Sequence, residues 1–318
     1  MAEEIRLDVQ NEDSGARLDV FLSDHVPMTR SAAANLIAKG SVEVDGIVRR
    51  SSFRLKYGMT IHVVIERSDE PGRMKEYDLP LDILYEDSCI IVLNKPAGLV
   101  VHPGAGNRDE TLVNALIRRY PDISGVGDMA RPGIVHRLDK LTSGVMVVAR
   151  NQDAYNVLAG AFKKHEHTRI YQALCYGHMG EDAGRIETLM DRHPGDRKKM
   201  SSKVAHGREA ITDWKVLQEW PQFSLLELSL MTGRTHQIRV HLSDMGHPVV
   251  ADPQYGGKKT ANSIINPMIR ARVKSLGRQM LYAWKLGIVH PATGEKMEFT
   301  ADIPADMHKL IELLDSTI

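Results

Sequence analysis

Hydrophobic residues near the start of the chain recur at helical spacing. Leu18, Phe21 and Leu22 fall on one face of a short predicted helix. A second helix is predicted next, because Thr29 is a suitable N-cap and Gly40 a suitable end for the apolar stretch between them.

Strand patterns follow these helices. Val42 and Val44 alternate with polar residues, and Asp45-Gly46 is typical of a tight hairpin turn. The apolar run over 59–66 predicts another strand. Two helices followed by short strands predict a compact module.

A polar stretch over 67–80 that contains Pro and Gly is interpreted as a linker. Beyond it, apolar runs predict strands over 83–85, 89–93, 145–149, 170–176, 210–217 and 224–230. Helical patterns alternate loosely with them, over 111–119, 152–165, 235–245 and 307–314. Because strands dominate, an α+β fold is favoured over a doubly wound one. The expected division is an N-terminal segment of 1–13, a module with its linker over 14–75, and a large domain over 76–318.

The composition is that of a globular protein. The 318 residues are 42% hydrophobic and 26% charged, with 41 basic and 41 acidic side chains. No apolar run reaches the roughly 18 residues of a membrane span, and the acidic start is neither a signal nor a transit peptide. Cys89 and Cys175 lie in apolar contexts, which indicates buried free thiols and a cytoplasmic protein.

The charge is unevenly distributed although its sum is zero. Residues 14–65 carry seven Lys or Arg against four Asp or Glu, 191–208 carry six against two, and 253–294 carry seven against none. Solvated loops explain any one segment, whereas three separated basic segments favour a surface that binds a polyanion such as nucleic acid.

Common cofactor and metal motifs are absent from the sequence, which has no GxxxxGK[ST], no GxGxxG behind a strand, no HExxH and no CxxC. His236 and His241 are five residues apart, which does not place two ligands on one helical face. We therefore expect chemistry without a metal or cofactor.

Three polar islands stand out. Asp139 is flanked by cations where a strand gives way to a loop, so it is either an ionised nucleophile or base, or half of a structural ion pair. Tyr171 is either a core residue or a ring that stacks on a nucleobase. Arg234, His236 and Arg239, near the start of a helix, either bind phosphate or a carboxylate or are surface cations.

Two local features complete the pattern. Thr235 and Gly246 are the expected N-cap and end of that last helix. The stretch 94–107 holds three glycines and two prolines after a strand, so it is either a shaped loop near a site or an irregular connection.

These islands, in this order, resemble the RluA/RluD family of RNA pseudouridine synthases. The matching stretches are NKPAGLVVHPG at 94–104, HRLDKLTSG at 136–144, RIYQAL at 169–174, GRTHQIRVHL at 233–242 and LYAWKLGIVHP at 281–291. The resemblance covers roughly 15–315, and HRLD followed by GRTHQIR is highly specific. Residues 16–65 resemble an S4 (αL-like) RNA-binding domain, and the details are most similar to the RluD branch, which modifies large-subunit rRNA.

The resemblance implies an isomerase that breaks the N-glycosidic bond of a uridine in RNA, rotates the uracil and rejoins it through C5. Asp139 matches the catalytic aspartate, Tyr171 the tyrosine that stacks on the target base, and Arg239 the basic residue paired with the aspartate. Arg137 matches an arginine that enters the space left by the extruded nucleotide. The family fold is a mixed, mostly antiparallel sheet of two halves with a basic cleft between them.

Further residues are expected to bind RNA. In the large domain they are His136, Arg137, Arg234 and His236, and in the S4-like module they are Arg17, Arg30, Lys39, Arg49 and Arg50. The expected substrate is a stem-loop of large-subunit (23S) rRNA, free or in a pre-ribosomal particle, and the expected enzyme is a cytoplasmic monomer with no membrane partner. Two alternatives stay open: a non-catalytic RNA-binding or ribosome-assembly protein, and a hydrolase with a carboxylate nucleophile.

Two positions depart from the family pattern. Leu141 stands where relatives usually carry an acid, and we expect it to alter local RNA contacts without disabling the chemistry. Glu110 stands where relatives carry glycine; its place at a helix start favours an acid, so we interpret the change as neutral.

Overall fold

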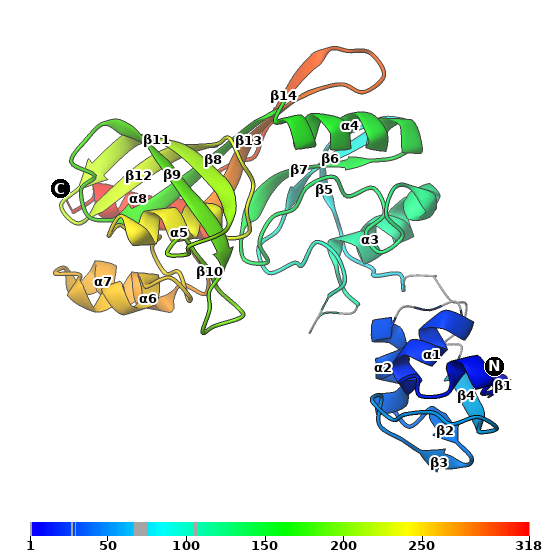
Figure 1. Cartoon of the computed structure of the whole chain (residues 1–318). Coiled ribbons are helices and arrows are strands. Elements are labelled where there is room, and N and C mark those ends of the chain that lie inside the picture. Colours follow the sequence, from blue (N-terminus) through cyan, green and yellow to red (C-terminus); the bar gives the residue numbers. More distant parts are fainter. Residues whose placement is uncertain are drawn as a thin grey trace. The chain divides into compact units, whose positions relative to one another are not determined.

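The computed structural model describes residues 2–26, 28, 30–66, 75–104, 107 and 109–317. It divides the chain into two compact units, Met1–Arg73 and Met74–Ile318, each with its own hydrophobic core (Figure 1). The expected N-cap Thr29 and most of the expected linker, 67–74, lie outside the described residues. None of the described helices is long and apolar enough to cross a membrane.

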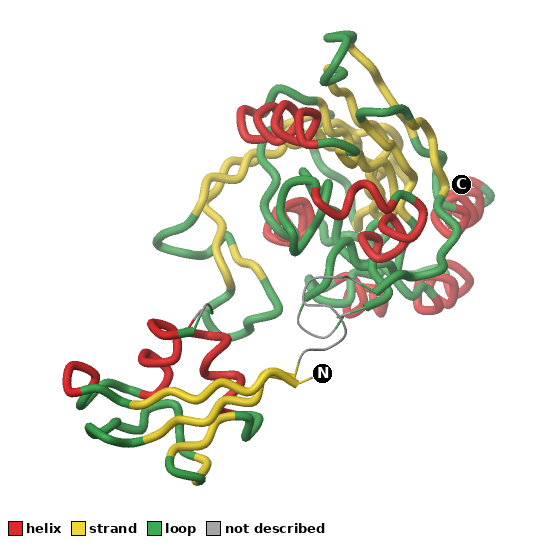
Figure 2. The backbone as a smooth tube through the Cα atoms, turned by 90° about the vertical axis from the view of Figure 1, so that its right-hand side faces the viewer, coloured by secondary structure: helices red, strands yellow, loops and turns green. Residues whose placement is uncertain are grey.

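The N-terminal unit is a four-stranded antiparallel sheet with two helices on one side of it (Figure 2). The strand order is β1-β4-β2-β3. The elements are β1 (Ala2–Asp8), η1 (Asn11–Asp13), α1 (Leu18–His25), α2 (Arg30–Ala38), β2 (Val42–Val44), β3 (Ile47–Val48) and β4 (Thr60–Glu66). Residues 1–13 are therefore not a separate segment, because β1 pairs with β4 along its whole length.

Two local predictions for this unit are confirmed. Leu18, Phe21 and Leu22 are all buried on one face of α1, where they pack into the core of the unit. In the hairpin between β2 and β3, Asp45 and Gly46 have φ angles of 51° and 74°. Two successive positive φ angles are typical of the type I′ turn, whose twist matches that of the flanking strands.

The larger unit is built on one ten-stranded sheet of order β10-β9-β11-β12-β8-β13-β7-β6-β5, with β14 paired to β13. The strands are β5 (Asp82–Glu86), β6 (Ile90–Lys95), β7 (Ser143–Ala149), β8 (Thr168–Tyr176), β9 (Ala183–Arg192), β10 (Met200–Ser201), β11 (Arg208–Trp220), β12 (Phe223–Leu230), β13 (Leu281–Val289) and β14 (Lys296–Thr300). The pairs are antiparallel except β13 with β7, so the expected mixed, mostly antiparallel sheet is confirmed.

The short parallel pair between β7 and β13 joins the two parts of the sheet. It consists of Tyr282 with Ser143 and Ala283 with Gly144. Gly144 has a φ of 121°, and a Cβ atom there would lie 2.1 Å from the carbonyl oxygen of Ala283. Only glycine fits this approach. The loop that carries Asp139 runs directly into β7, so this junction positions the loop.

Helices cover both parts of the sheet (Figure 1). They are α3 (Leu112–Arg119), η2 (Pro121–Gly125), α4 (Gln152–Lys164), α5 (Gln237–Asp244), α6 (Gly257–Thr260), η3 (Ala261–Ser263), α7 (Pro267–Ser275) and α8 (Ala305–Asp315). The start of α4 follows the sequence rule, because the Asn151 side chain accepts a hydrogen bond from the backbone N–H of Ala154 at 2.9 Å.

Three sequence interpretations need correction. Cys89 and Cys175 are both free thiols, but only Cys175 is fully buried, and Cys89 is half-buried at the bend before β6. Glu110 precedes the N-cap of α3 and has a φ of 61°. This left-handed conformation is free of strain only for glycine, so the change from glycine is not neutral for the backbone. The spacing of Ile238, Leu242 and Met245 predicts one packed face for α5, but Met245 is 37% exposed.

Candidate active site

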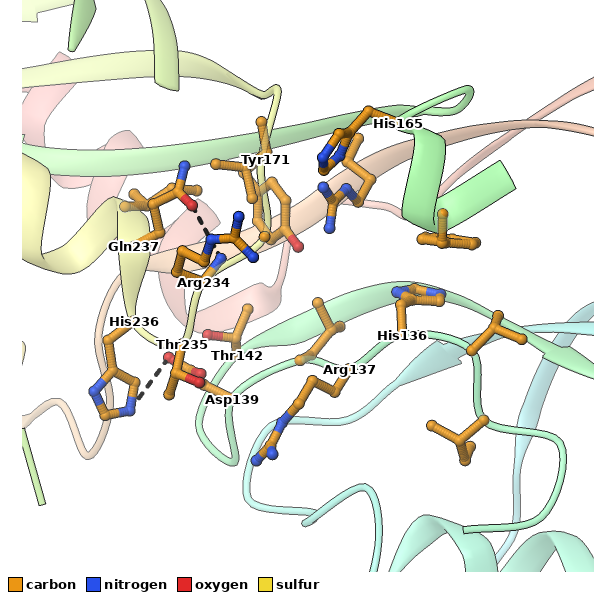
Figure 3. A pocket seen from close by; sticks show the side chains of 18 of the residues that line it. His136, Arg137, Asp139, Thr142, His165, Tyr171, Arg234, Thr235, His236 and Gln237 are labelled. Atoms are coloured by element: carbon orange, nitrogen blue, oxygen red, sulfur yellow. Dashed lines mark hydrogen bonds and ion pairs between the residues drawn. The ribbon is translucent and has the colours of Figure 1, made fainter. Parts of the chain in front are cut away.

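A cavity of about 700 Å³ opens beside the loop that leads into β7. Most of the side chains around it come from this loop, from α4 and its end, from β8 and from the segment that starts α5 (Figure 3). All the predicted site residues of the larger unit line it, namely His136, Arg137, Asp139, Tyr171, Arg234, His236 and Arg239. The structure thus brings together residues that are up to about a hundred positions apart in the sequence.

The two oxygens of Asp139 have different surroundings. Oδ2 accepts a hydrogen bond from Nη1 of Arg239 at 2.9 Å and lies 3.8 Å from Nε2 of His236. Oδ1 has no hydrogen bond or ion pair with any described residue. The side chain is 20% exposed. One oxygen is therefore held by protein donors, and the other is available to a substrate in the cavity.

Arg239 is buried and held on every side. Its Nε donates to Oδ2 of Asp252 at 2.6 Å, and its Nη2 donates to Oδ1 of Asp252 at 3.0 Å and to Oε1 of Gln254 at 2.8 Å. Burial alone would lower the pKa of Arg239, but the hydrogen bonds and charges of Asp252 and Asp139 outweigh burial and raise it. The guanidinium is therefore a fixed positive charge beside Asp139.

The start of α5 differs from the expectation in a way that affects the site. The N-cap is His236, with a φ of 59°, and not Thr235. Gln237 holds this turn, because its amide oxygen accepts the backbone N–H of Arg234 and its amide nitrogen donates to the carbonyl of Ile211. The expected end of α5 is confirmed, since Gly246 has a φ of 88°.

Tyr171 forms part of the cavity wall from the middle of β8. It is 7% exposed, and its hydroxyl has no hydrogen bond with the described residues. Burial raises the pKa of this phenol; the charge of Arg169 opposes the rise and that of Asp139 adds to it. Tyr171 is therefore a neutral phenol whose hydroxyl is available to hydrogen-bond a ligand.

His136 is fixed against the opposite wall. Its ring stacks on that of Phe162, with centroids 4.6 Å apart, and its Nε2 accepts the backbone N–H of Val147 at 3.1 Å. Burial, with the neighbouring charges of Arg169 and His167, lowers the pKa of His136 to about 3. The imidazole is neutral at pH 7, so any contact with RNA is a neutral hydrogen bond or a ring contact.

Lys95 lies behind the loop that carries Asp139 and is completely buried. Its Nζ donates to the carbonyl oxygens of Pro96 at 2.8 Å, Leu99 at 2.9 Å and Lys140 at 3.3 Å. These bonds join the loop after β6 to the residue that follows Asp139. Burial lowers the pKa of Lys95 to about 7, whereas the charge of Asp139 opposes this. The stretch 94–107 is thus a shaped loop beside the site in its described part.

A second cavity of about 740 Å³ shares six lining residues with the first, among them Arg137, Arg208, Arg234 and His236. Its other cationic residues come, like Arg208, from the basic stretch of 191–208, and they are Arg192, Arg197, Lys198 and Lys199. Asp191 is the one acid among its lining residues. One of the three basic segments in the sequence therefore reaches the site.

Of the five predicted RNA-binding residues of the N-terminal unit, two share a single partner. Arg17 and Arg30 both pair with Asp19, at 2.9 Å and 3.0 Å. The hydrogen bond from Arg17 is the largest influence that lowers the pKa of this buried carboxylate, to about 2. Lys39 follows the end of α2 and is exposed, and Arg49 and Arg50 follow β3, before the loop that packs against the start of α1.

Asp252 and Tyr255 were missed by the sequence reasoning. Asp252 holds Arg239, and the Tyr255 hydroxyl lies 2.7 Å from Nδ1 of His236. A signal for Asp252 exists in the sequence, because it is the one acid between Asp244 and Glu295. A single acid in a basic stretch is a good candidate for a buried ion pair.

A cluster away from the cavity also offers ligand atoms. Atoms of Asp87, Cys89 and His290 lie within 4.8 Å of one another. The backbone N–H of Thr293 donates to Nδ1 of His290, which places the imidazole proton on Nε2, and Nε2 lies 2.8 Å from Asp87. This pair therefore accounts for the arrangement as a link between the turn before β6 and the end of β13.

Comparisons with known proteins agree with this geometry. A family profile described as RNA pseudouridylate synthase matches residues 89–244. An uncharacterized RNA pseudouridine synthase of Synechocystis sp. is 42% identical over 96% of this chain and 90% of its own. The ribosomal large subunit pseudouridine synthases D of Neisseria meningitidis serogroup B and Escherichia coli strain K12 are 42% and 39% identical, over 98% and 99% of this chain and 82% and 96% of theirs.

A solved structure shows the same fold. Human RNA pseudouridylate synthase domain containing 1 superposes with a TM-score of 0.55 at 27% identity, over 78% of this chain and 98% of that chain. Relatives about 40% identical over nearly the whole length, the matching profile and the shared fold together show that this chain belongs to the RNA pseudouridylate synthase family.

Proposed function

We propose that this protein isomerises uridines to pseudouridine in large-subunit ribosomal RNA, with Asp139 as the catalytic nucleophile. The observation that carries the proposal is one carboxylate oxygen held at 2.9 Å by a buried guanidinium while the other is free at an open cavity. The two relatives named as ribosomal large subunit synthases support the choice of RNA.

The reaction rearranges one nucleotide without a net gain or loss of atoms. The bond from ribose C1′ to uracil N1 breaks, C1′ joins C5, the proton on C5 leaves and N1 gains one. The target base must first leave its stack, which costs a few kcal/mol and costs least in a loop. A ring such as that of Tyr171 recovers about 1–3 kcal/mol by stacking on the base.

Each neighbour of Asp139 has a role in this scheme. Arg239 keeps the carboxylate ionised and fixes its direction. Tyr171 stacks on the uracil, and its hydroxyl is placed to exchange a proton during the isomerisation. Arg137, an exposed cation in the same loop, fills the space that the extruded nucleotide leaves.

The RNA backbone needs cations beside the site. We assign this role to a basic cleft formed by the two adjoining cavities, where His136, Arg234 and His236 line the first and the cations of 191–208 line the second. The N-terminal unit, with its exposed Lys39 and Arg50, acts as an S4 RNA-binding module. We place the protein in the cytoplasm as a monomer that modifies free rRNA or a pre-ribosomal particle.

The test uses unmodified large-subunit RNA and two variants. Asp139→Asn keeps the size of the side chain and removes its charge, and we expect it to form no pseudouridine while still binding the RNA. Asp302→Asn, at an exposed aspartate after β14, is the matched control and should retain full activity. Pseudouridine formed by Asp139→Asn would overturn the assignment of the nucleophile, and RNA bound but unmodified by the unaltered protein would favour an assembly factor.

A further inference from the structure

Two nitrogen atoms lie within hydrogen-bonding distance of the Tyr255 hydroxyl, and together they determine the direction in which it donates its proton. The backbone N–H of Met200 donates to this hydroxyl at 2.8 Å, and Nδ1 of His236 lies 2.7 Å from it. A backbone N–H can only donate, so the Tyr255 oxygen accepts that bond. His236 Nδ1 is the one acceptor for the phenol proton among the described residues. The bond therefore runs from the Tyr255 O–H to Nδ1.

This direction fixes the tautomer of His236. When Nδ1 accepts a proton from Tyr255, the proton of a neutral imidazole sits on Nε2. Nε2 lies 3.8 Å from Oδ2 of Asp139, and a dashed line marks this contact in Figure 3. Burial lowers the pKa of His236, the charge of Asp139 opposes this and that of Arg239 adds to it, so the ring is neutral at pH 7.

The backbone of His236 adopts a strained conformation where its side chain approaches Asp139. His236 has a φ of 59° at the start of α5, a conformation that few residues other than glycine adopt. Its ring meets that of Tyr255 edge to face, with centroids 5.5 Å apart. Strain at one residue that points its side chain at the candidate nucleophile is typical of functional sites.

The same turn also holds the other donor to Asp139. The ring of Tyr255 lies 5.0 Å from the guanidinium carbon of Arg239. The backbone N–H of Tyr255 donates to Oδ1 of Asp252 at 3.0 Å, and Asp252 in turn holds Arg239. Residues 252–255 thus support both side chains that approach Oδ2.

We propose that Tyr255 is a positioning residue, which holds neutral His236 with its Nε2 proton directed at Oδ2 of Asp139. Arg239 and His236 then both direct N–H groups at Oδ2, and Oδ1 is the oxygen that reacts with the substrate. The separation of 3.8 Å is too long for a hydrogen bond, and it shortens when the RNA closes the site. The inference rests on the proposed role of Asp139, but the tautomer of His236 is a property of the protein without RNA.

The first test reads the tautomer directly. The full-length protein is labelled with ¹⁵N at histidine, and the imidazole signals of His236 are assigned by their loss in His236→Gln. We expect the Nε2–H tautomer in the unaltered protein and in Tyr282→Phe, a control that removes another buried tyrosine hydroxyl, bonded to Gln172. Tyr255→Phe should shift His236 to a mixture of tautomers. An Nδ1–H tautomer in the unaltered protein, or no change in Tyr255→Phe, would overturn the proposal.

The second test separates positioning from a structural role in the β10 segment, to which Met200 belongs. Tyr255→Phe should lower kcat roughly tenfold to a hundredfold with little change in KM. His236→Gln places an amide N–H near the Nε2 position without needing Tyr255, so it should retain more activity than His236→Asn. Adding Tyr255→Phe to His236→Gln should then cost little.

The outcomes distinguish this inference from the proposed function. If Tyr255→Phe costs as much in the His236→Gln background as in the unaltered protein, the hydroxyl acts through the fold, and the inference fails. If no variant and not even the unaltered protein forms pseudouridine, the proposed function fails, whereas the NMR experiment still decides the tautomer.

Discussion

Replacing Asp252 with asparagine tests how much the buried pair with Arg239 contributes to stability. The Asp252 side chain is 0% exposed, and its oxygens accept bonds from Nε and Nη2 of Arg239 and from the backbone N–H groups of Gln254 and Tyr255. Asparagine has one acceptor oxygen, so its NH2 group faces a donor of Arg239 in either orientation: Nε at the Oδ2 position, or Nη2 together with the two backbone N–H groups at the Oδ1 position. Breaking a buried pair costs about 3–5 kcal/mol. Because Asp139 and Gln254 still face Arg239, we expect a loss of about 3 kcal/mol.

The assay is urea unfolding followed by tryptophan fluorescence. The three tryptophans, Trp214, Trp220 and Trp284, all lie in the larger unit, so the signal reports on the unit that contains the pair. Asp213→Asn is the control, because Asp213 pairs with Arg185 at the surface, where such a pair contributes about 0–1 kcal/mol. Equal losses of stability in the two variants would refute the reasoning.

Three further predictions concern the reaction and the fold. Tyr171→Phe should keep the stacking ring but lower kcat tenfold or more, by loss of the hydroxyl that exchanges a proton; an unchanged kcat would leave only stacking. Glu110→Gly should raise the free energy of unfolding by roughly 0.5–1 kcal/mol, because relief of the left-handed strain exceeds the entropy cost of glycine; a lower urea midpoint would contradict this. Burial lowers the pKa of His241 to about 4, so the unfolded chain binds more protons between pH 6.5 and pH 4 and stability falls as the pH drops through this range. Between pH 7 and pH 5, the free energy of unfolding of His241→Gln should therefore fall by about 2 kcal/mol less than that of the unaltered protein in the same assay. An equal fall would show that His241 does not titrate in this range.

Hydrophobic spacing predicted the helices and strands whose pattern of apolar residues is complete within the element itself. The core strand 145–149 falls within β7, and the helix predicted over 152–165 begins after the N-cap Asn151. β1 was missed because Ile5 and Leu7 alternate with charged residues, which made the start of the chain look like an exposed tail. A half-buried edge strand and a polar tail share this pattern, and only the partner strand β4 distinguishes them.

The sequence predicted which residues form the site, but it did not predict how they are arranged. Asp139, Tyr171 and Arg239 were each ambiguous when taken singly, and the order of the motifs singled them out. Tyr255 carries no such signal, because the role we propose for it depends on a bond to His236 nineteen residues away and on the strained φ of that residue. Sequence spacing does not encode which oxygen of Asp139 is held and which is free.

The most direct measurement of the central claim is a map of pseudouridines in large-subunit rRNA from cells that lack this protein. The account predicts that specific pseudouridines disappear, return when the unaltered protein is supplied, and stay absent with Asp139→Asn. Unchanged modification in the deletion strain, or restoration by Asp139→Asn, would contradict it.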